Sequence, residues 1–159
     1  MSKEKLLKYD AGSCNLRTIG KQPKQIRGSY DIVSAAFDIM PAFAQEEHLA
    51  ILLLDCNRIV LDSGIISIGS RTSCVADPAS VFRHAITTCG CEYVALVHNH
   101  PNGDPTPSRA DLDGTVRMIQ AGEIMGITVI DHVVVGNGTR SYVSIRECLD
   151  NFEQEDKAV

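Results

Sequence analysis

The feature that most constrains the fold is an almost continuous run of apolar residues, Leu-Ala-Ile-Leu-Leu-Leu, at positions 49–54. Two acidic residues, Glu46 and Glu47, stand before it, and the turn-forming sequence Asp55-Cys56-Asn57 follows it. An amphipathic strand would alternate apolar and polar residues, whereas this run has no polar side to turn toward water. The run therefore predicts a strand over residues 48–54 that is buried on both faces.

Helix and strand patterns alternate along the rest of the chain. Helical patterns, with apolar residues three and four positions apart, cover residues 30–41, 77–90 and 108–126. Strand patterns cover residues 59–69, 92–97, 127–135 and 140–145, and Asp62-Ser63-Gly64 predicts a bulge in the first of them. Strands that alternate with helices predict an α/β sandwich with a mixed sheet.

Charge is distributed unevenly along the chain. Residues 1–28 hold seven Lys or Arg and two acidic residues, a net charge of +5, which leaves −10 for residues 29–159. We expect a basic, irregular arm (1–28), one folded domain (29–146) and an acidic, frayed tail (147–159). The overall charge of −5 argues against a protein that coats nucleic acid, although a basic arm is compatible with a DNA contact.

Neither a membrane segment nor a secretory signal is visible in the sequence. No apolar run reaches the roughly 18–20 residues of a membrane helix, and no apolar segment follows the polar N-terminus. We therefore expect a cytoplasmic protein without a membrane partner. In that setting, and with 159 residues to build a core, we expect most of the six cysteines to be reduced thiols.

The residues that carry chemistry lie between a predicted strand and a predicted helix. His98 and His100 stand two apart at the strand end, so both imidazoles face one side, roughly 6–7 Å apart. Three prolines stiffen the loop over residues 101–107, which can hold Asp111 at a fixed distance from both rings. Two histidines and one carboxylate leave a fourth tetrahedral position for water, as catalytic zinc requires.

Part of this pattern has a second explanation. Ser108-Arg109-Ala110-Asp111 matches the capping-box signature S-x-x-[DE], which needs no metal, and each histidine alone could be an ordinary packed or surface residue. A capping role does not exclude Ser108 from catalysis. An N-cap serine accepts through an oxygen lone pair, so we expect its O–H to remain available to an oxyanion.

The spacing His98-x-His100, seven residues, then Ser108-x-x-Asp111 resembles the JAMM motif of the JAB/MPN metalloproteases. The string HNHPNGDPTPS over 98–108, with Asp131-His132-Val133-Val134-Val135-Gly136 downstream, resembles the bacterial RadC branch of that family over residues 30–145. This resemblance implies a JAB/MPN-like mixed sheet flanked by helices, a cytidine-deaminase-like sandwich. It also implies Zn²⁺ held by His98, His100 and Asp111, with Ser108 stabilising the tetrahedral intermediate.

The resemblance further implies a glutamate on an early strand as general acid and base. Glu47 matches that position and Glu46 competes with it; since adjacent strand residues face opposite ways, only one can reach the site, and we favour Glu47. The implied activity is hydrolysis of a peptide or isopeptide bond in a protein or peptide substrate. Asp131 or His132 could orient a metal ligand by a hydrogen bond without touching the metal; the alternative is a purely structural pairing at a turn.

The alternative function is a non-catalytic RadC-like module associated with DNA repair that binds DNA or a protein partner. The basic arm would then make the contact. Relatives of this branch usually carry an N-terminal helix-hairpin-helix region, and residues 1–28 are too few to form one.

Overall fold

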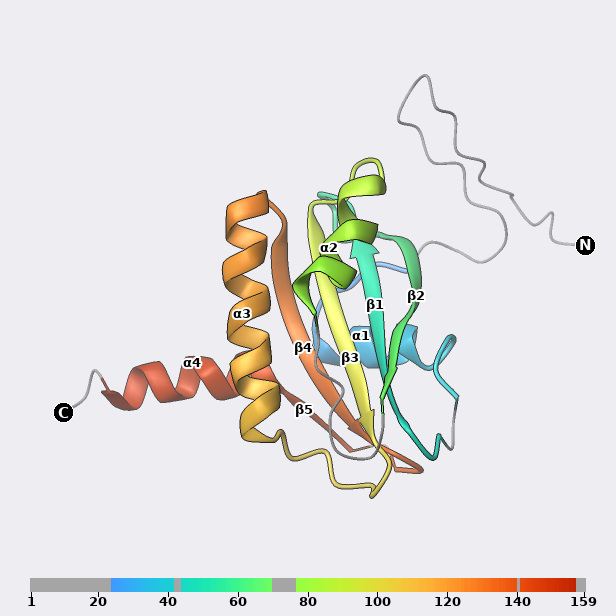
Figure 1. Cartoon of the computed structure of the whole chain (residues 1–159), viewed down its shortest axis with the longest axis vertical. Coiled ribbons are helices and arrows are strands. Elements are labelled where there is room, and N and C mark those ends of the chain that lie inside the picture. Colours follow the sequence, from blue (N-terminus) through green and yellow to red (C-terminus); the bar gives the residue numbers. More distant parts are fainter. Residues whose placement is uncertain (1–23, 42–43, 70–76, 140, 157–159) are drawn as a thin grey trace, which may run out of the picture.

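The computed structural model of the chain describes residues 24–41, 44–69, 77–139 and 141–156. Five strands form a single mixed sheet in the order β2-β1-β3-β4-β5 (Figure 1). The strands are β1 (Glu47–Leu54), β2 (Val60–Gly69), β3 (Tyr93–His100), β4 (Thr128–Gly136) and β5 (Tyr142–Ser144). Only β3 and β4 run parallel, and the other neighbours are antiparallel. The predicted α/β fold with a mixed sheet is confirmed.

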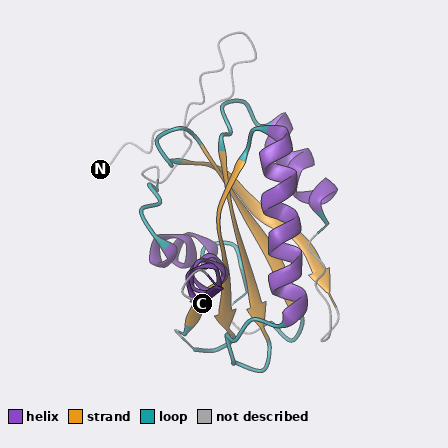
Figure 2. Ribbon diagram, turned by 90° about the vertical axis from the view of Figure 1, so that its left-hand side faces the viewer, coloured by secondary structure: helices purple, strands orange, loops and turns teal. Residues whose placement is uncertain are grey.

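The apolar run of β1 explains where the helices lie, because its alternate side chains need cover on both faces of the sheet. Leu49, Ile51 and Leu53 pack in one core cluster with residues of α2 (Pro78–Thr87) and α3 (Arg109–Met125). Ala50, Leu52 and Leu54 pack in a second cluster with residues of α1 (Ser29–Ala36). The edge-on view shows the long α3 on one side of the sheet and α1 on the other (Figure 2). The sheet is therefore the middle layer of three.

Most of the predicted elements occur with shifted ends. The first helix stops at Ala36 and continues only as a turn, in which the Met40 N–H donates to the Ala36 carbonyl. β2 is one strand without a break at residues 62–64, and its pairing with β1 shifts register next to Ile66 and Leu61 instead. The helix expected from Ser108 to Gly126 has those two residues as its N-cap and C-cap.

The predicted frayed tail (147–159) is wrong for residues 147–156, which belong to the helix α4 (Ile145–Asp156). The Ser144 hydroxyl accepts a hydrogen bond from the Glu147 N–H, and Arg146 pairs with Asp150 one turn further on. Ser144 lies inside the predicted strand over 140–145, so its capping role was hidden.

Of the predicted basic arm, residues 1–23 lie outside the described residues. Residues 24–28 are described: the Lys24 carbonyl accepts from the Val60 N–H at the start of β2, and the Ile26 N–H donates to the Arg58 carbonyl just before it. No helix in the part of the chain that the structure describes is both long and apolar enough to cross a bilayer. Among the described cysteines, Cys56, Cys91 and Cys148 are free thiols and Cys89 is disulfide-bonded.

Candidate metal centre

Three side chains from two elements converge at the end of β3. His100 is the last residue of that strand and His98 stands two residues before it, so both side chains lie on one face, and Asp111 lies in the first turn of α3. The Nε2 atoms of the two imidazoles are 3.1 Å apart. Asp111 Oδ1 lies 3.4 Å from His98 Nε2, and Oδ2 lies 3.5 Å from His100 Nε2. The predicted cluster is therefore present, and its three residues could hold a metal ion.

The separations between these atoms match the size of a tetrahedral site. Bonds of about 2.0–2.2 Å to imidazole nitrogen and carboxylate oxygen place neighbouring ligand atoms about 3.3–3.5 Å apart. His98 Nε2 lies 3.1 Å from His100 Nε2 and 3.4 Å from Asp111 Oδ1, both within a few tenths of an ångström of that range, and His100 Nε2 lies 3.5 Å from the other oxygen, Oδ2. The rings need little movement to share one ion, and three protein ligands leave one tetrahedral position open.

The loop between His100 and Ser108 determines which ring nitrogen of His100 carries the hydrogen. Its Nδ1 lies 2.8 Å from the Asp104 carbonyl oxygen, which can only accept a hydrogen bond. Nδ1 therefore carries the hydrogen, and in the neutral ring the lone pair of Nε2 points to the cluster. Two further bonds shape the loop, from the Asp104 N–H to Asn102 and from the Thr106 N–H to Asp104.

Ser108 and Asp111 form the capping box that the sequence suggested as a second explanation. Ser108 Oγ accepts from the Asp111 N–H, while the Ser108 N–H donates to Asp111 Oδ2 at 2.7 Å. The expectation that the Ser108 O–H remains available is wrong, because this hydroxyl also donates to Oδ2 at 2.7 Å. Oδ2 is thus occupied by Ser108, and Oδ1 is the better placed oxygen for a metal ion.

The charges in the cluster stabilise one another. Burial raises the pKa of Asp111, but the neighbouring imidazoles of His100 and His98, together with the hydrogen bond from Ser108, outweigh burial and hold this pKa well below its usual range. The hydrogen bond to Asp111 in turn raises the pKa of His100 against the effect of its own burial. Burial, followed by repulsion from His98, lowers the pKa of His132 well below its ordinary value.

These shifts predict an optimum in the stability of the metal-free protein near pH 6.5, the ordinary histidine pKa. His100, with a raised pKa, contributes stability that is complete below pH 6.5 and is lost as the pH rises through its folded-state value. His132, with a lowered pKa, contributes stability that is complete above pH 6.5 and is lost as the pH falls. Urea unfolding in the presence of a chelator between pH 5.5 and 8.5 measures both limbs of this stability curve, the rise below pH 6.5 and the fall above it. His100→Asn should abolish the upper limb, and a steady rise of stability to pH 8.5 in the wild type would contradict the prediction.

The two candidate bases at the start of β1 lie in different surroundings. Glu47 is half-buried and shares the strand face of Leu49, which packs with Leu96 on the same side of the sheet as His98. Its charge contributes to the raised pKa of His100, whereas Glu46 is exposed and precedes the strand. The placement of Glu47 agrees with the choice of Glu47 over Glu46 that the family resemblance suggested, and its role as a base remains a prediction.

Asn99, the residue between the two histidines, holds the start of β1 in place. Its side chain is buried on the opposite face of β3, where Oδ1 accepts from the His48 N–H at 2.7 Å. Its Nδ2 donates to the Glu46 carbonyl at 3.1 Å. These two hydrogen bonds hold the backbone on either side of Glu47 in place. Sequence reasoning missed this residue, although its position between two residues of one strand face already placed it on the other.

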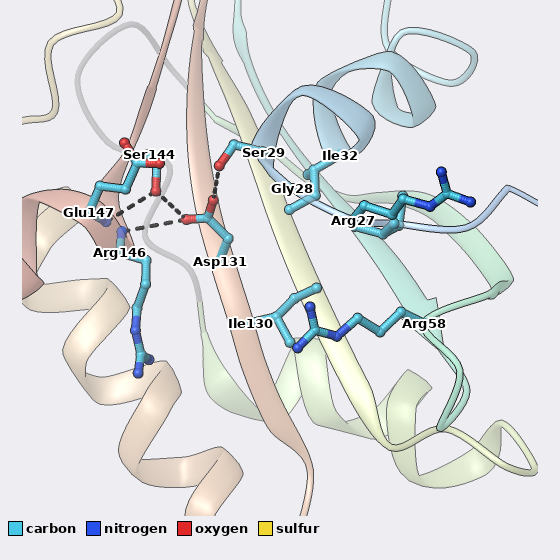
Figure 3. Close-up of a pocket in the computed structure, with 11 residues that line it drawn as sticks. Arg27, Gly28, Ser29, Ile32, Arg58, Ile130, Asp131, Ser144, Arg146 and Glu147 are labelled. Carbon is cyan, nitrogen blue, oxygen red and sulfur yellow. Dashed lines mark hydrogen bonds between the residues drawn. The ribbon is translucent and has the colours of Figure 1, made fainter.

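Asp131 and His132 point to opposite faces of β4, which separates their roles. Asp131 lies at a surface pocket of about 180 Å³ on the α1 side of the sheet, where Ser29 and Ser144 donate to its two carboxylate oxygens (Figure 3). The backbone N–H groups of His132 and Arg146 donate to it as well. Asp131 therefore joins the N-terminal ends of α1 and α4, and only His132 faces the metal cluster.

Comparison with known proteins identifies the family of this chain. Residues 26–150 match the model of the family described as RadC-like JAB domain. A UPF0758 protein of Methanococcoides burtonii is 38% identical over 124 residues, which cover 78% of this chain and 52% of that protein. A UPF0758 protein of Bacillus cereus is 39% identical over 139 residues, covering 87% and 60%.

A third relative, a UPF0758 protein of Thermosynechococcus vestitus, is 41% identical over 108 residues, covering 68% of this chain and 42% of the relative. The chain thus spans about half the length of the curated relatives that it matches. The family model covers most of the chain, from before α1 to within α4. The chain belongs to the RadC-like JAB domain family.

Proposed function

We propose that this domain is a zinc-dependent hydrolase of the JAMM type that cleaves a peptide or isopeptide bond. The observation that carries the proposal is the triangle of His98 Nε2, His100 Nε2 and the Asp111 carboxylate, with separations of 3.1–3.5 Å. Two imidazoles and one carboxylate are a donor set of catalytic zinc sites. Zinc, when bound, would lower the pKa of a coordinated water towards about 7 and polarise a substrate carbonyl.

The residues of the chain then have distinct tasks. Glu47, on the same face of the sheet as His98, would accept a proton from water and return it to the leaving amine nitrogen. Ser108 would stabilise the developing oxyanion through its O–H. In the structure this hydroxyl donates to Asp111 Oδ2, so it must exchange that partner for the substrate oxygen during the reaction.

Metal stoichiometry tests the first part of this proposal. The purified full chain, stripped with a chelator and dialysed against zinc, is expected to retain about one zinc ion per chain, and Asp111→Ala is expected to retain almost none. Elemental analysis by mass spectrometry gives the ratio. Loss of the carboxylate removes one of the three ligands, and the one that carries negative charge.

Asp113→Ala is the matched control for this experiment. Asp113 lies two residues further along α3, where its exposed carboxylate pairs with Arg109 at 3.1 Å. This variant should bind zinc like the wild type, and circular dichroism should show that both variants fold. A folded wild type without zinc, or a folded Asp111→Ala variant that keeps it, would contradict the metal site.

A further inference from the structure

His132 lies behind the metal cluster, between a proposed metal ligand and helix α3. Its Nε2 is 2.8 Å from His98 Nδ1, and its Nδ1 is 2.6 Å from Thr115 Oγ1. Thr115 Oγ1 is 2.7 Å from the backbone carbonyl oxygen of Asp111. His98, His132 and Thr115 are each at most 3% exposed, so no solvent competes for these bonds. Both ring nitrogens of His132 are engaged, and it is not itself a ligand of the cluster.

The direction of each hydrogen bond between His98 and Asp111 follows from the last one, which Thr115 makes to the Asp111 carbonyl. A carbonyl oxygen can only accept, so the Thr115 O–H must donate to Asp111. Because the hydroxyl has one hydrogen, Thr115 Oγ1 can only accept from His132, and Nδ1 of His132 therefore carries a hydrogen. A charged imidazole buried beside other imidazoles is costly, so His132 is neutral and its Nε2 has a lone pair.

The lone pair of His132 Nε2 completes the chain at His98. It accepts a hydrogen bond from Nδ1 of His98, which places the hydrogen of that ring on the side away from the cluster. The remaining nitrogen of His98, Nε2, then turns its lone pair to His100 and Asp111. A metal ion requires this form of the ring, because a protonated nitrogen cannot act as a ligand.

We propose that His132 and Thr115 are positioning residues that set the metal affinity of the cluster by holding His98 in the form with hydrogen on Nδ1. This inference rests on the proposed metal site and adds two residues that never touch the ion. The chain of bonds also starts and ends at metal ligands, since it runs from the Asp111 backbone to the His98 ring. It therefore fixes the position of α3 relative to β3, the two elements that supply the ligands.

The test compares zinc dissociation constants, measured by competition with a chromophoric chelator at pH 7.5. His132→Leu removes the acceptor for His98, and Thr115→Val replaces the hydroxyl by a methyl group of similar size. Removing a hydrogen-bond partner behind a metal ligand typically weakens metal binding about 10–100-fold, which is the loss expected for His132→Leu. Thr115→Val should show a smaller loss in the same direction, and Thr115→Ser, which keeps the hydroxyl, should restore the affinity.

A second measurement separates positioning from a general loss of structure. Long-range ¹⁵N–¹H NMR of the metal-free protein reports which ring nitrogen carries hydrogen. The wild type and Thr115→Ser should show His98 with hydrogen on Nδ1, whereas Thr115→Val should show a mixture of the two forms. A loss of packing alone would lower the melting temperature without changing this ratio.

The outcomes distinguish this inference from the proposed function. Wild-type protein that binds no zinc would contradict the metal site itself. Tight zinc binding by the wild type together with unchanged affinity in folded His132→Leu would leave the metal site intact and overturn the role of His132. Hydrogen on Nε2 of His98 in the metal-free wild type would also overturn it.

Discussion

Replacing Asp131 by alanine is expected to lower the free energy of unfolding by about 3–5 kcal/mol and to leave zinc affinity unchanged. The carboxylate accepts hydrogen bonds from Ser29, Ser144, His132 N–H and Arg146 N–H, at distances of 2.8, 2.8, 2.7 and 3.4 Å. Hydrogen bonds to a charged group are worth about 1.5–3 kcal/mol each, and partners left buried without an acceptor add to the cost. The loss should therefore be among the largest for any side chain outside the apolar core.

Urea unfolding of the metal-free protein measures this loss, and chelator competition measures the zinc affinity. Asp131→Asn is the matched variant, because it keeps the shape and one carbonyl oxygen for Ser144 while it loses the charge. It should be destabilised by less than the alanine variant. A destabilisation of Asp131→Ala no larger than that of an exposed substitution would contradict the proposed link between α1 and α4. A change in zinc affinity would show that the two faces of the sheet are coupled.

Asp131 and His132 show why two adjacent residues of one motif have separate functions, and why sequence alone left the choice open. Simple alternation from Val129, which packs on the α3 side, would turn Asp131 toward the metal cluster and His132 away from it. The pairing of β3 with β4 instead shifts register between Val94 and Ala95, so that Ile130 is an extra residue. This bulge reverses the faces of all later residues. Nothing in the local pattern marks its position.

The parts of the site that follow from local rules were predicted correctly in position. Two histidines separated by one residue must share a strand face, and a Ser-x-x-Asp box must begin a helix, so the cluster follows once β3 and α3 are known. The Ser108 hydroxyl was misjudged because its preference for Asp111 depends on the carboxylate conformation, which spacing does not describe.

Thr115 was missed even though one local signal could have identified it. It stands four residues after Asp111, and residues at this spacing lie on the same face of a helix. A threonine in a helix can also donate back to the carbonyl four residues earlier, which it does here at 2.7 Å. Its second partner, His132, comes from another strand, and a long-range contact of this kind cannot be read from spacing.

Replacing Glu47 by glutamine is expected to reduce peptide hydrolysis by about 10²–10⁴-fold while zinc content remains that of the wild type. Glutamine has nearly the same shape but cannot accept a proton from water or deliver one to an amine. The probe is a mixture of synthetic peptides that includes one lysine isopeptide, incubated with the zinc-loaded full chain, and mass spectrometry measures the cleavage products with their newly released amines. Glu46→Gln is the matched control, because Glu46 is the exposed neighbour that precedes β1.

A second probe tells proton delivery apart from activation of water. The ester 4-nitrophenyl acetate releases a phenolate, which leaves without a proton, so only the first of the two proposed tasks of Glu47 is needed. Glu47→Gln should therefore impair hydrolysis of the ester less than hydrolysis of the peptides, and the two losses would be equal if Glu47 acted only on water. Full peptide hydrolysis by zinc-loaded Glu47→Gln, with loss of hydrolysis in Glu46→Gln, would transfer the role to Glu46. Asn99 holds the backbone on both sides of Glu47. Such a result would therefore also require the first residues of β1 to exchange their faces in solution.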